Sequence, residues 1–224
     1  MNGELEEKKQ RPITHTNRYI LSIHRVLPVL ANERHHVEAP LSQCPAALQG
    51  VFLSAFHDLL RPFLTHLPQI DGLPTGSTQQ LLSKWEVGSR RKSPAVDLIE
   101  LQALVMIALG SDHWESGGQS DSRLKIESIT KAVGLAYSMG LHLAKPPADT
   151  TSEFDRNQSQ WVALQTWWTL VSFDRWDALA TGRLAIINND AAVILPGLEH
   201  VVGKSVYQFH RKDSRPHWTP AFLT

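Results

Sequence analysis

Two acid–base groups close together in the chain are the first candidates for chemistry. Asp174 and Arg175 are adjacent in a long segment rich in apolar residues, and Arg183 and Asp190 follow it. Neighbouring side chains on a helix point about 100° apart, so Asp174 and Arg175 satisfy each other poorly. A charge on a core-facing helix stripe is costly unless it is paired. The pattern therefore favours a structural clasp, completed by Arg183 and Asp190, over a catalytic acid–base site.

Two adjacent tryptophans precede these charges at helical spacing. Trp167 and Trp168 lie on the stripes that lead through Val171 to the charged pair. Such rings could line a ligand site, but the apolar area that they bury favours core packing. Gly182 is typical of a helix C-terminal cap. The predicted clasp therefore consists of Trp167, Trp168, Asp174, Arg175, Gly182, Arg183 and Asp190.

The remaining reactive residue types form no convincing site. Asp97 and Glu100 share a helix face, but negative charge in the first turns of a helix is favoured by the helix dipole. The 11 histidines show no zinc-binding spacing, and Cys44 has no base suggested by its neighbours. The basic run SRRKS, residues 89–93, is typical of a solvated loop, with nuclear import or phosphate contact as alternatives. We predict that this chain is not an enzyme and that it carries no catalytic residue, no metal and no cofactor.

Composition limits the partners and the compartment. Lys+Arg and Asp+Glu balance at 22 each, so the chain as a whole has no basic excess to draw it to nucleic acid. One cysteine excludes a disulfide framework and a cysteine zinc site, which suits a reducing compartment. No signal-peptide pattern and no long apolar run occurs. We expect a soluble intracellular protein without a membrane partner.

Apolar periodicity predicts helices along almost the whole chain. The expected fold is all-α, with paired antiparallel helices, irregular loops and a tail. Residues 1–13 form a polar lead, residues 14–200 the domain and residues 201–224 the irregular tail. Residues 32–45 are expected to be a loop, and 184–187 are the best, short candidate for a strand. The expected helices are about 16–31, 45–67, 78–86, 94–110, 121–140 and 152–182.

Helix boundaries are indicated by capping residues. Ser93-Pro94 combines a cap with a first-turn proline, and Gly110 ends that helix. Ser152 and Asp155 resemble a capping box before the tryptophan helix. Pro62 is expected to kink the second helix.

The order of several motifs resembles the fungal transcription factor domain. This is the middle homology region of fungal binuclear zinc-cluster transcription factors, and the resemblance is best over residues 45–200. Family members commonly have arginines where this chain has Gln165 and Thr166, and proline where it has Leu184. Two earlier segments, 101–110 and 129–142, resemble the helices that precede the tryptophan helix. The motifs that carry the resemblance are Trp167-Trp168, Asp174-Arg175, Gly182-Arg183, Asp190 and Pro196.

The resemblance implies a function that the residues alone do not reach. It implies a regulatory domain acting in the nucleus on RNA polymerase II transcription. In the family a separate N-terminal module, with six cysteines around two zinc ions, binds DNA. This chain lacks that module, so the resemblance implies zinc binding and DNA binding for the family but not for these residues. Transcription co-regulators and a small-molecule effector are the expected partners. The alternative is a ligand-sensing or protein-interaction helical module without DNA binding.

Overall fold

The computed structural model describes residues 29–30, 34–61, 77–88, 93–111, 120–144 and 158–188. Within these ranges the regular structure is entirely helical, with no β-strand, which confirms the predicted all-α class. The candidate strand at 184–187 is irregular backbone. The helices are α2 (Arg34–Ser42), α3 (Ala46–Leu60), α4 (Thr78–Gly88), α5 (Pro94–Gly110), α6 (Ser120–Ser138), the short 3-10 helix η4 (Leu141–Leu143) and α7 (Gln158–Thr181).

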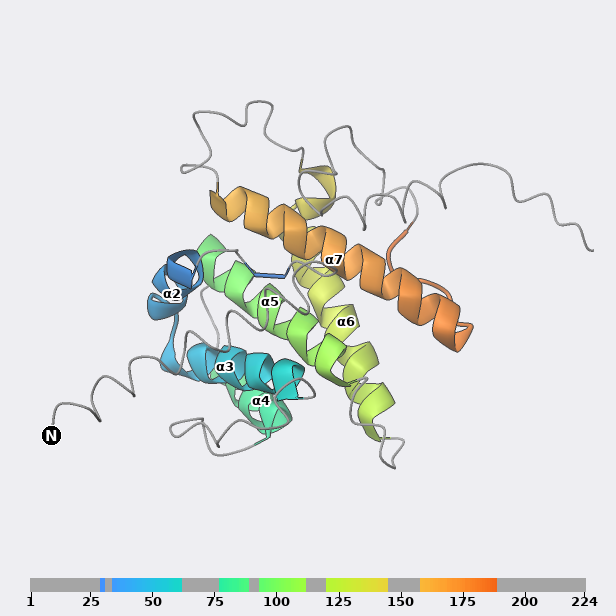
Figure 1. Cartoon of the computed structure of the whole chain (residues 1–224), viewed down its shortest axis with the longest axis horizontal. Coiled ribbons are helices and arrows are strands. Elements are labelled where there is room, and N and C mark those ends of the chain that lie inside the picture. Colours follow the sequence, from blue (N-terminus) through green and yellow to red (C-terminus); the bar gives the residue numbers. More distant parts are fainter. Residues whose placement is uncertain are drawn as a thin grey trace, which may run out of the picture.

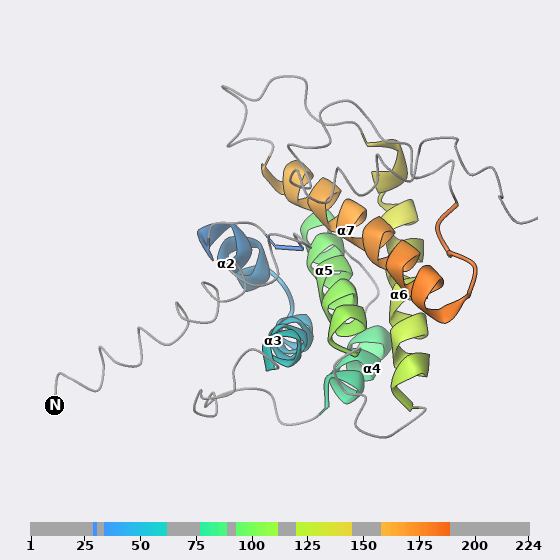
Figure 2. The same ribbon diagram turned by 45° about the vertical axis from the view of Figure 1, so that its right-hand side comes forward.

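Helix α5 lies at the centre of the molecule (Figure 1). Every residue from Leu98 to Gly110 is buried, so this helix has no solvent-facing side over that length. It contacts α2, α3, α6 and α7, while α4 packs on α3. Figure 2 shows α5 and α6 running in opposite directions, with α7 crossing both. A helix that is apolar all round needs such cover on every face.

Local rules explain both ends of α5. The Ser93 hydroxyl accepts a hydrogen bond from the Val96 backbone N–H at 3.4 Å, and Pro94 occupies the first helical position. Gly110 is the last residue of the helix, where α5 comes close to α3: a Cβ at Gly110 would lie 3.6 Å from the Leu59 backbone nitrogen. The predicted start and end of this helix are therefore confirmed.

Two glycines in the left-handed region close α6 and α7. Gly140 has φ +72 and follows the end of α6 by two residues. Gly182 has φ +68 and comes directly after Thr181, the last residue of α7. Glycine adopts this conformation without the steric cost that a Cβ brings. The predicted cap at Gly182 is confirmed, and it turns the chain so that the following segment runs back along α7 (Figure 2).

Two boundaries near the start of the domain were predicted wrongly. The expected loop at 32–45 contains α2, with Pro40 inside it. Packing explains this helix, because Val37 and Leu41, one turn apart, both lie against the core. Helix α3 ends at Leu60 and not near residue 67. The predicted kink at Pro62 lies outside the described residues. Arg61, the residue before Pro62, still has helical backbone angles, with φ −49 and ψ −43, and its N–H donates to carbonyls of the last turn of α3.

Other predictions fall on residues outside the described ranges. These are the polar lead, residues 16–28 of the first expected helix, the Ser152–Asp155 capping box and the tail at 201–224. Residues 29 and 30 are described and are not helical. Of the helices within the described ranges, none has the length and apolar character needed to cross a membrane.

Candidate functional site

Trp167 and Trp168 are both buried in the core. The Trp167 ring meets Tyr137 of α6 edge to face, with centroids 5.8 Å apart and planes at 80°. Tyr137 in turn packs on His142 of η4, with centroids 4.5 Å apart. This geometry is a favourable aromatic arrangement. Trp167 therefore links α7 to Tyr137 of α6, which in turn contacts η4, and Trp168 contributes to the buried core.

Asp174 binds the backbone of the segment that leaves α7. Its buried carboxylate accepts hydrogen bonds from the backbone N–H groups of Ile186, at 3.0 Å, and Ile187, at 2.9 Å. The Ile187 side chain is itself buried. Hydrogen bonds to a charged acceptor are roughly twice as strong as neutral ones. Asp174 therefore fixes the returning chain against the helix that it has just left.

Asp177, one turn further along α7, is held between two cations. The Lys125 ammonium of α6 lies 2.6 Å from Asp177 Oδ1, and the Arg183 guanidinium contacts Oδ2. The Lys125 contact is an ion pair without the alignment of a hydrogen bond. Asp177 is buried near the C-terminal end of α7, where the helix dipole disfavours negative charge. Two cations offset that cost.

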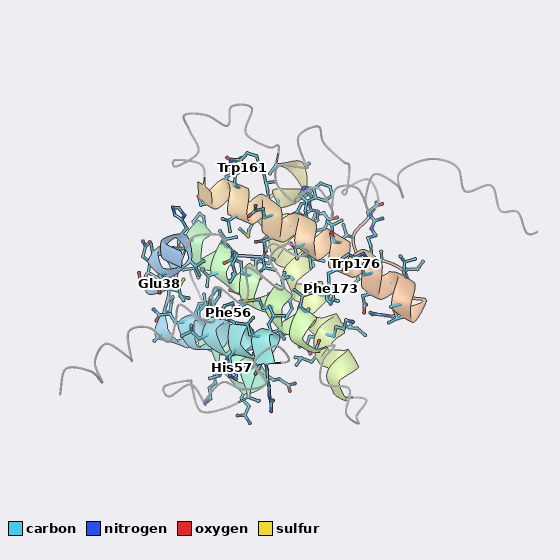
Figure 3. All side chains as sticks on the ribbon, viewed as in Figure 1. Glu38, Phe56, His57, Trp161, Phe173 and Trp176 are labelled. Carbon is cyan, nitrogen blue, oxygen red and sulfur yellow. The ribbon has the colours of Figure 1, made fainter. Side chains whose placement is uncertain are left out.

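Further contacts link these charges to the helix end. The Thr181 hydroxyl donates to the Asp177 carbonyl at 2.6 Å, and Arg183 Nε donates to the Thr181 hydroxyl oxygen at 3.1 Å. Lys125 Nζ lies 5.2 Å from the centre of the Phe173 ring, which Figure 3 labels on the side of α7 that faces α6. We call Lys125, Asp174, Asp177, Thr181 and Arg183 the exit cluster. It connects α6, the end of α7 and the segment up to Ile187.

The structure brings together only part of the predicted clasp. Asp174 is satisfied by backbone N–H groups, and not by Arg183, whose partner is Asp177. Arg175 is partly buried, and its Nε has no hydrogen-bond partner among the described residues. Asp190 lies outside the described residues. The predicted pairing of Asp174 with Arg183 is therefore wrong, and a pairing of Arg175 with Asp190 stays a prediction.

Sequence reasoning missed two central members of the exit cluster. A usable signal existed for Asp177, because a spacing of three from Asp174 places both carboxylates on neighbouring positions of one helix face. Nothing in the sequence pointed to Lys125, which reaches Asp177 from another helix.

The contacts of the exit cluster are those of a structural element. Both oxygens of Asp174 accept backbone N–H groups, and both oxygens of Asp177 contact cations. A general acid or base must reach a substrate proton from such an oxygen. Here all four oxygens are engaged within the chain, which favours a role in holding the fold.

The other candidate residues form no common site among the described residues. Asp97 is in the first turn of α5, as predicted, and Glu100 is buried one turn later. His57 Nδ1 lies 3.7 Å from Asp58 Oδ1. Across the described part of the chain, no three His, Cys, Asp or Glu residues are grouped to hold a metal ion. Residues 89–92 of the basic run lie outside that part, as do the histidines at positions 66 and 113.

Cys44 is a buried free thiol. Its Sγ lies 3.3 Å from the Pro40 carbonyl oxygen, to which it donates. Burial raises the pKa of the Cys44 thiol, so its reactive thiolate form is disfavoured.

Comparison with known proteins gives one relative. The chain is 25% identical over 173 residues to an uncharacterized transcriptional regulatory protein of Schizosaccharomyces pombe. The match covers 74% of this chain but 19% of that protein, so the chain spans about one fifth of the relative's length. No family model matches the chain. No solved structure matches it either.

Proposed function

We propose that this chain is a regulatory domain of a fungal zinc-cluster-type transcription factor and that it regulates RNA polymerase II transcription in the nucleus. The similarity to the Schizosaccharomyces pombe transcriptional regulatory protein carries this proposal. The ordered motifs of α7 and its exit, from Trp167-Trp168 to Gly182-Arg183, support the assignment to the zinc-cluster class. The all-helical body agrees with it.

The residues present do not fit a zinc cluster of this class. Such a module needs six cysteines, and this chain has one, Cys44, which is buried against α2. The balanced charge of the chain also gives no general attraction to DNA. In our proposal, DNA is therefore bound by another part of the whole protein, and the domain acts on transcription through its contacts with that part, with co-regulators or with a small-molecule effector.

A tethered reporter assay tests the regulatory role. The whole chain is fused to a heterologous DNA-binding module, with and without an activation domain, and expressed in yeast with a matching reporter gene. We expect the chain to raise basal expression or to lower activated expression, relative to fusions that lack it. Both arms are needed because activation and repression give opposite signs.

Two variants control for folding. Trp167→Ala removes the largest fully buried side chain among the described residues and should cost about 3–5 kcal/mol of stability, so the reporter effect should disappear with the fold. Glu127→Gln changes an exposed carboxylate and should leave the effect intact. Reporter output equal to that of the chain-free fusions in both arms, with an intact protein seen in the nucleus, would refute the proposal.

A further inference from the structure

Exposed apolar side chains gather at the end of α7 and in the segment that follows it. Leu184 is 94% exposed, Leu179 75% and Ile186 40%. Among the described residues these are three of the six exposed large hydrophobic side chains, and they lie within eight positions of the sequence. Single exposed leucines are common on protein surfaces, whereas exposed apolar residues that gather at one place indicate an interaction surface.

The backbone that carries these side chains is held in place by the exit cluster. The Asp174 carboxylate accepts the backbone N–H of Ile186 itself, at 3.0 Å. Arg183, which precedes Leu184, contacts the Asp177 carboxylate. A partner that binds here therefore meets a backbone that is already ordered, and the entropy cost of binding is smaller.

The charges at this end of α7 favour an acidic partner. Between positions 175 and 188 the only carboxylate is that of Asp177, which is buried and contacts two cations. The Arg183 side chain is 35% exposed, and Arg175 is partly exposed. Arg175 lies four residues before Leu179, so the two share a helix face. Within this stretch, solvent therefore meets aliphatic side chains beside guanidinium groups and meets no exposed carboxylate.

The same charges disfavour a second copy of this chain as the partner. Lys125, Arg175 and Arg183 outnumber Asp174 and Asp177 by one positive charge. Two such surfaces facing each other would bring like charges together, which is unfavourable.

A partly exposed tryptophan adds to the character of an interface. Figure 3 labels Trp176 on this part of α7, three residues before Leu179 and hence on a neighbouring position of the helix surface. Tryptophan and arginine are the residue types that contribute most to binding at protein interfaces. Both types occur here next to the exposed leucines.

We propose that Leu179, Leu184 and Ile186, with Arg175 and Arg183, form a docking surface for an acidic amphipathic helix of a partner protein. We call these five residues the exit surface. The aliphatic face of the partner helix packs on the leucines and Ile186, and its carboxylates pair with the two guanidinium groups. This inference does not depend on the transcriptional role. Its test measures binding alone, so it can fail while the reporter effect stands.

Peptide binding followed by fluorescence anisotropy tests the proposal. The probe is a labelled synthetic helix of leucine, alanine and glutamate, with leucines at spacings of three and four on one face and glutamates on the other. We expect saturable binding to the whole chain with a Kd of about 100 μM or tighter. A second peptide with lysine in place of every glutamate should not bind. Equal binding of the two peptides, or no binding of the acidic peptide, would overturn the proposal.

One substitution on the exit surface and one elsewhere locate the binding. Leu184→Ser should weaken binding of the acidic peptide about tenfold, because a leucine that is buried on binding contributes at least that factor. Leu143→Ser is the matched control, since Leu143 of η4 is 75% exposed and lies outside the exit surface. It should leave the affinity unchanged. Equal affinities of the two variants would refute the assignment of the site.

Folding and self-association are checked on the same proteins. Leu184 is almost fully exposed, so circular dichroism should show an unchanged Tm for Leu184→Ser. A lower Tm would show that Leu184 stabilises the fold and would overturn its role in docking. Light scattering should give a monomer for the unmodified chain. A dimer that Leu184→Ser dissociates would assign the exit surface to a second copy and refute the acidic partner.

Discussion

The most direct test of the exit cluster is Asp174→Asn. The variant keeps the size of the side chain but replaces one carboxylate oxygen by an NH2 group. That group cannot accept a hydrogen bond, so only one of the N–H groups of Ile186 and Ile187 retains an acceptor. The other N–H then faces a second donor. The change therefore removes one charge-assisted hydrogen bond without creating a cavity.

The size of the effect follows from the burial of this contact. A hydrogen bond to a charged group contributes about 1.5–3 kcal/mol, and a buried donor left unsatisfied costs about 1–3 kcal/mol. The lost hydrogen bond and the unsatisfied donor are partly the same contribution, so they do not add in full. We therefore expect the free energy of unfolding to fall by about 2–4 kcal/mol. For a chain of this size, that corresponds to a decrease in Tm of roughly 5–15 °C.

Thermal and urea unfolding, followed by circular dichroism, measure the change. Glu127→Gln is the matched control, because it makes the same chemical change in an exposed carboxylate that pairs with Lys131 at 2.8 Å. An exposed pair of this kind contributes about 0.3–0.5 kcal/mol. A loss for Asp174→Asn no larger than that of Glu127→Gln would refute the reasoning.

Three further changes test other parts of the structure. Lys125→Met removes one of the two cations that contact Asp177. Because Arg183 remains, the free energy of unfolding should fall by less than the roughly 3–5 kcal/mol typical of a buried charge without a partner. A larger fall in urea unfolding would contradict the sharing of Asp177 between the two cations. Gly182→Ala should cost about 1–2 kcal/mol, since φ is +68 but the surrounding space is open; an unchanged Tm would argue against that backbone conformation. Cys44 should react slowly with iodoacetamide at neutral pH and rapidly in urea, because burial shields the thiol and raises its pKa; equal rates would be inconsistent with its burial.

Features set by neighbouring residues were predictable from the sequence. Ser93, Pro94 and Gly110 mark the ends of α5, and Gly182 the end of α7, because caps and left-handed glycines depend on local backbone geometry. Helix α2 was missed because its stability comes from packing of Val37 and Leu41, which local preferences do not record.

Contacts between distant parts of the chain could not be derived in the same way. Asp177 meets Lys125 across 52 positions, and Val29 meets Thr166 across 137. Sequence spacing indicates which residues share a helix face, but not which face of another helix lies opposite. The predicted clasp therefore had the right helix and the right turn, but the wrong partner for Asp174.

The complete burial of α5 also affects how this domain tolerates sequence change. From Leu98 to Gly110 no position faces solvent, so a larger residue at any of them crowds a neighbouring helix, and a polar residue needs a buried partner. Helix α7 differs, because its last turns include exposed positions such as Leu179 and Ala180. Variation between related chains should therefore accumulate near the end of α7 and be rare along all sides of α5. Because α5 has no solvent-facing side from Leu98 to Gly110, it has no positions there where substitutions would leave the packing unchanged.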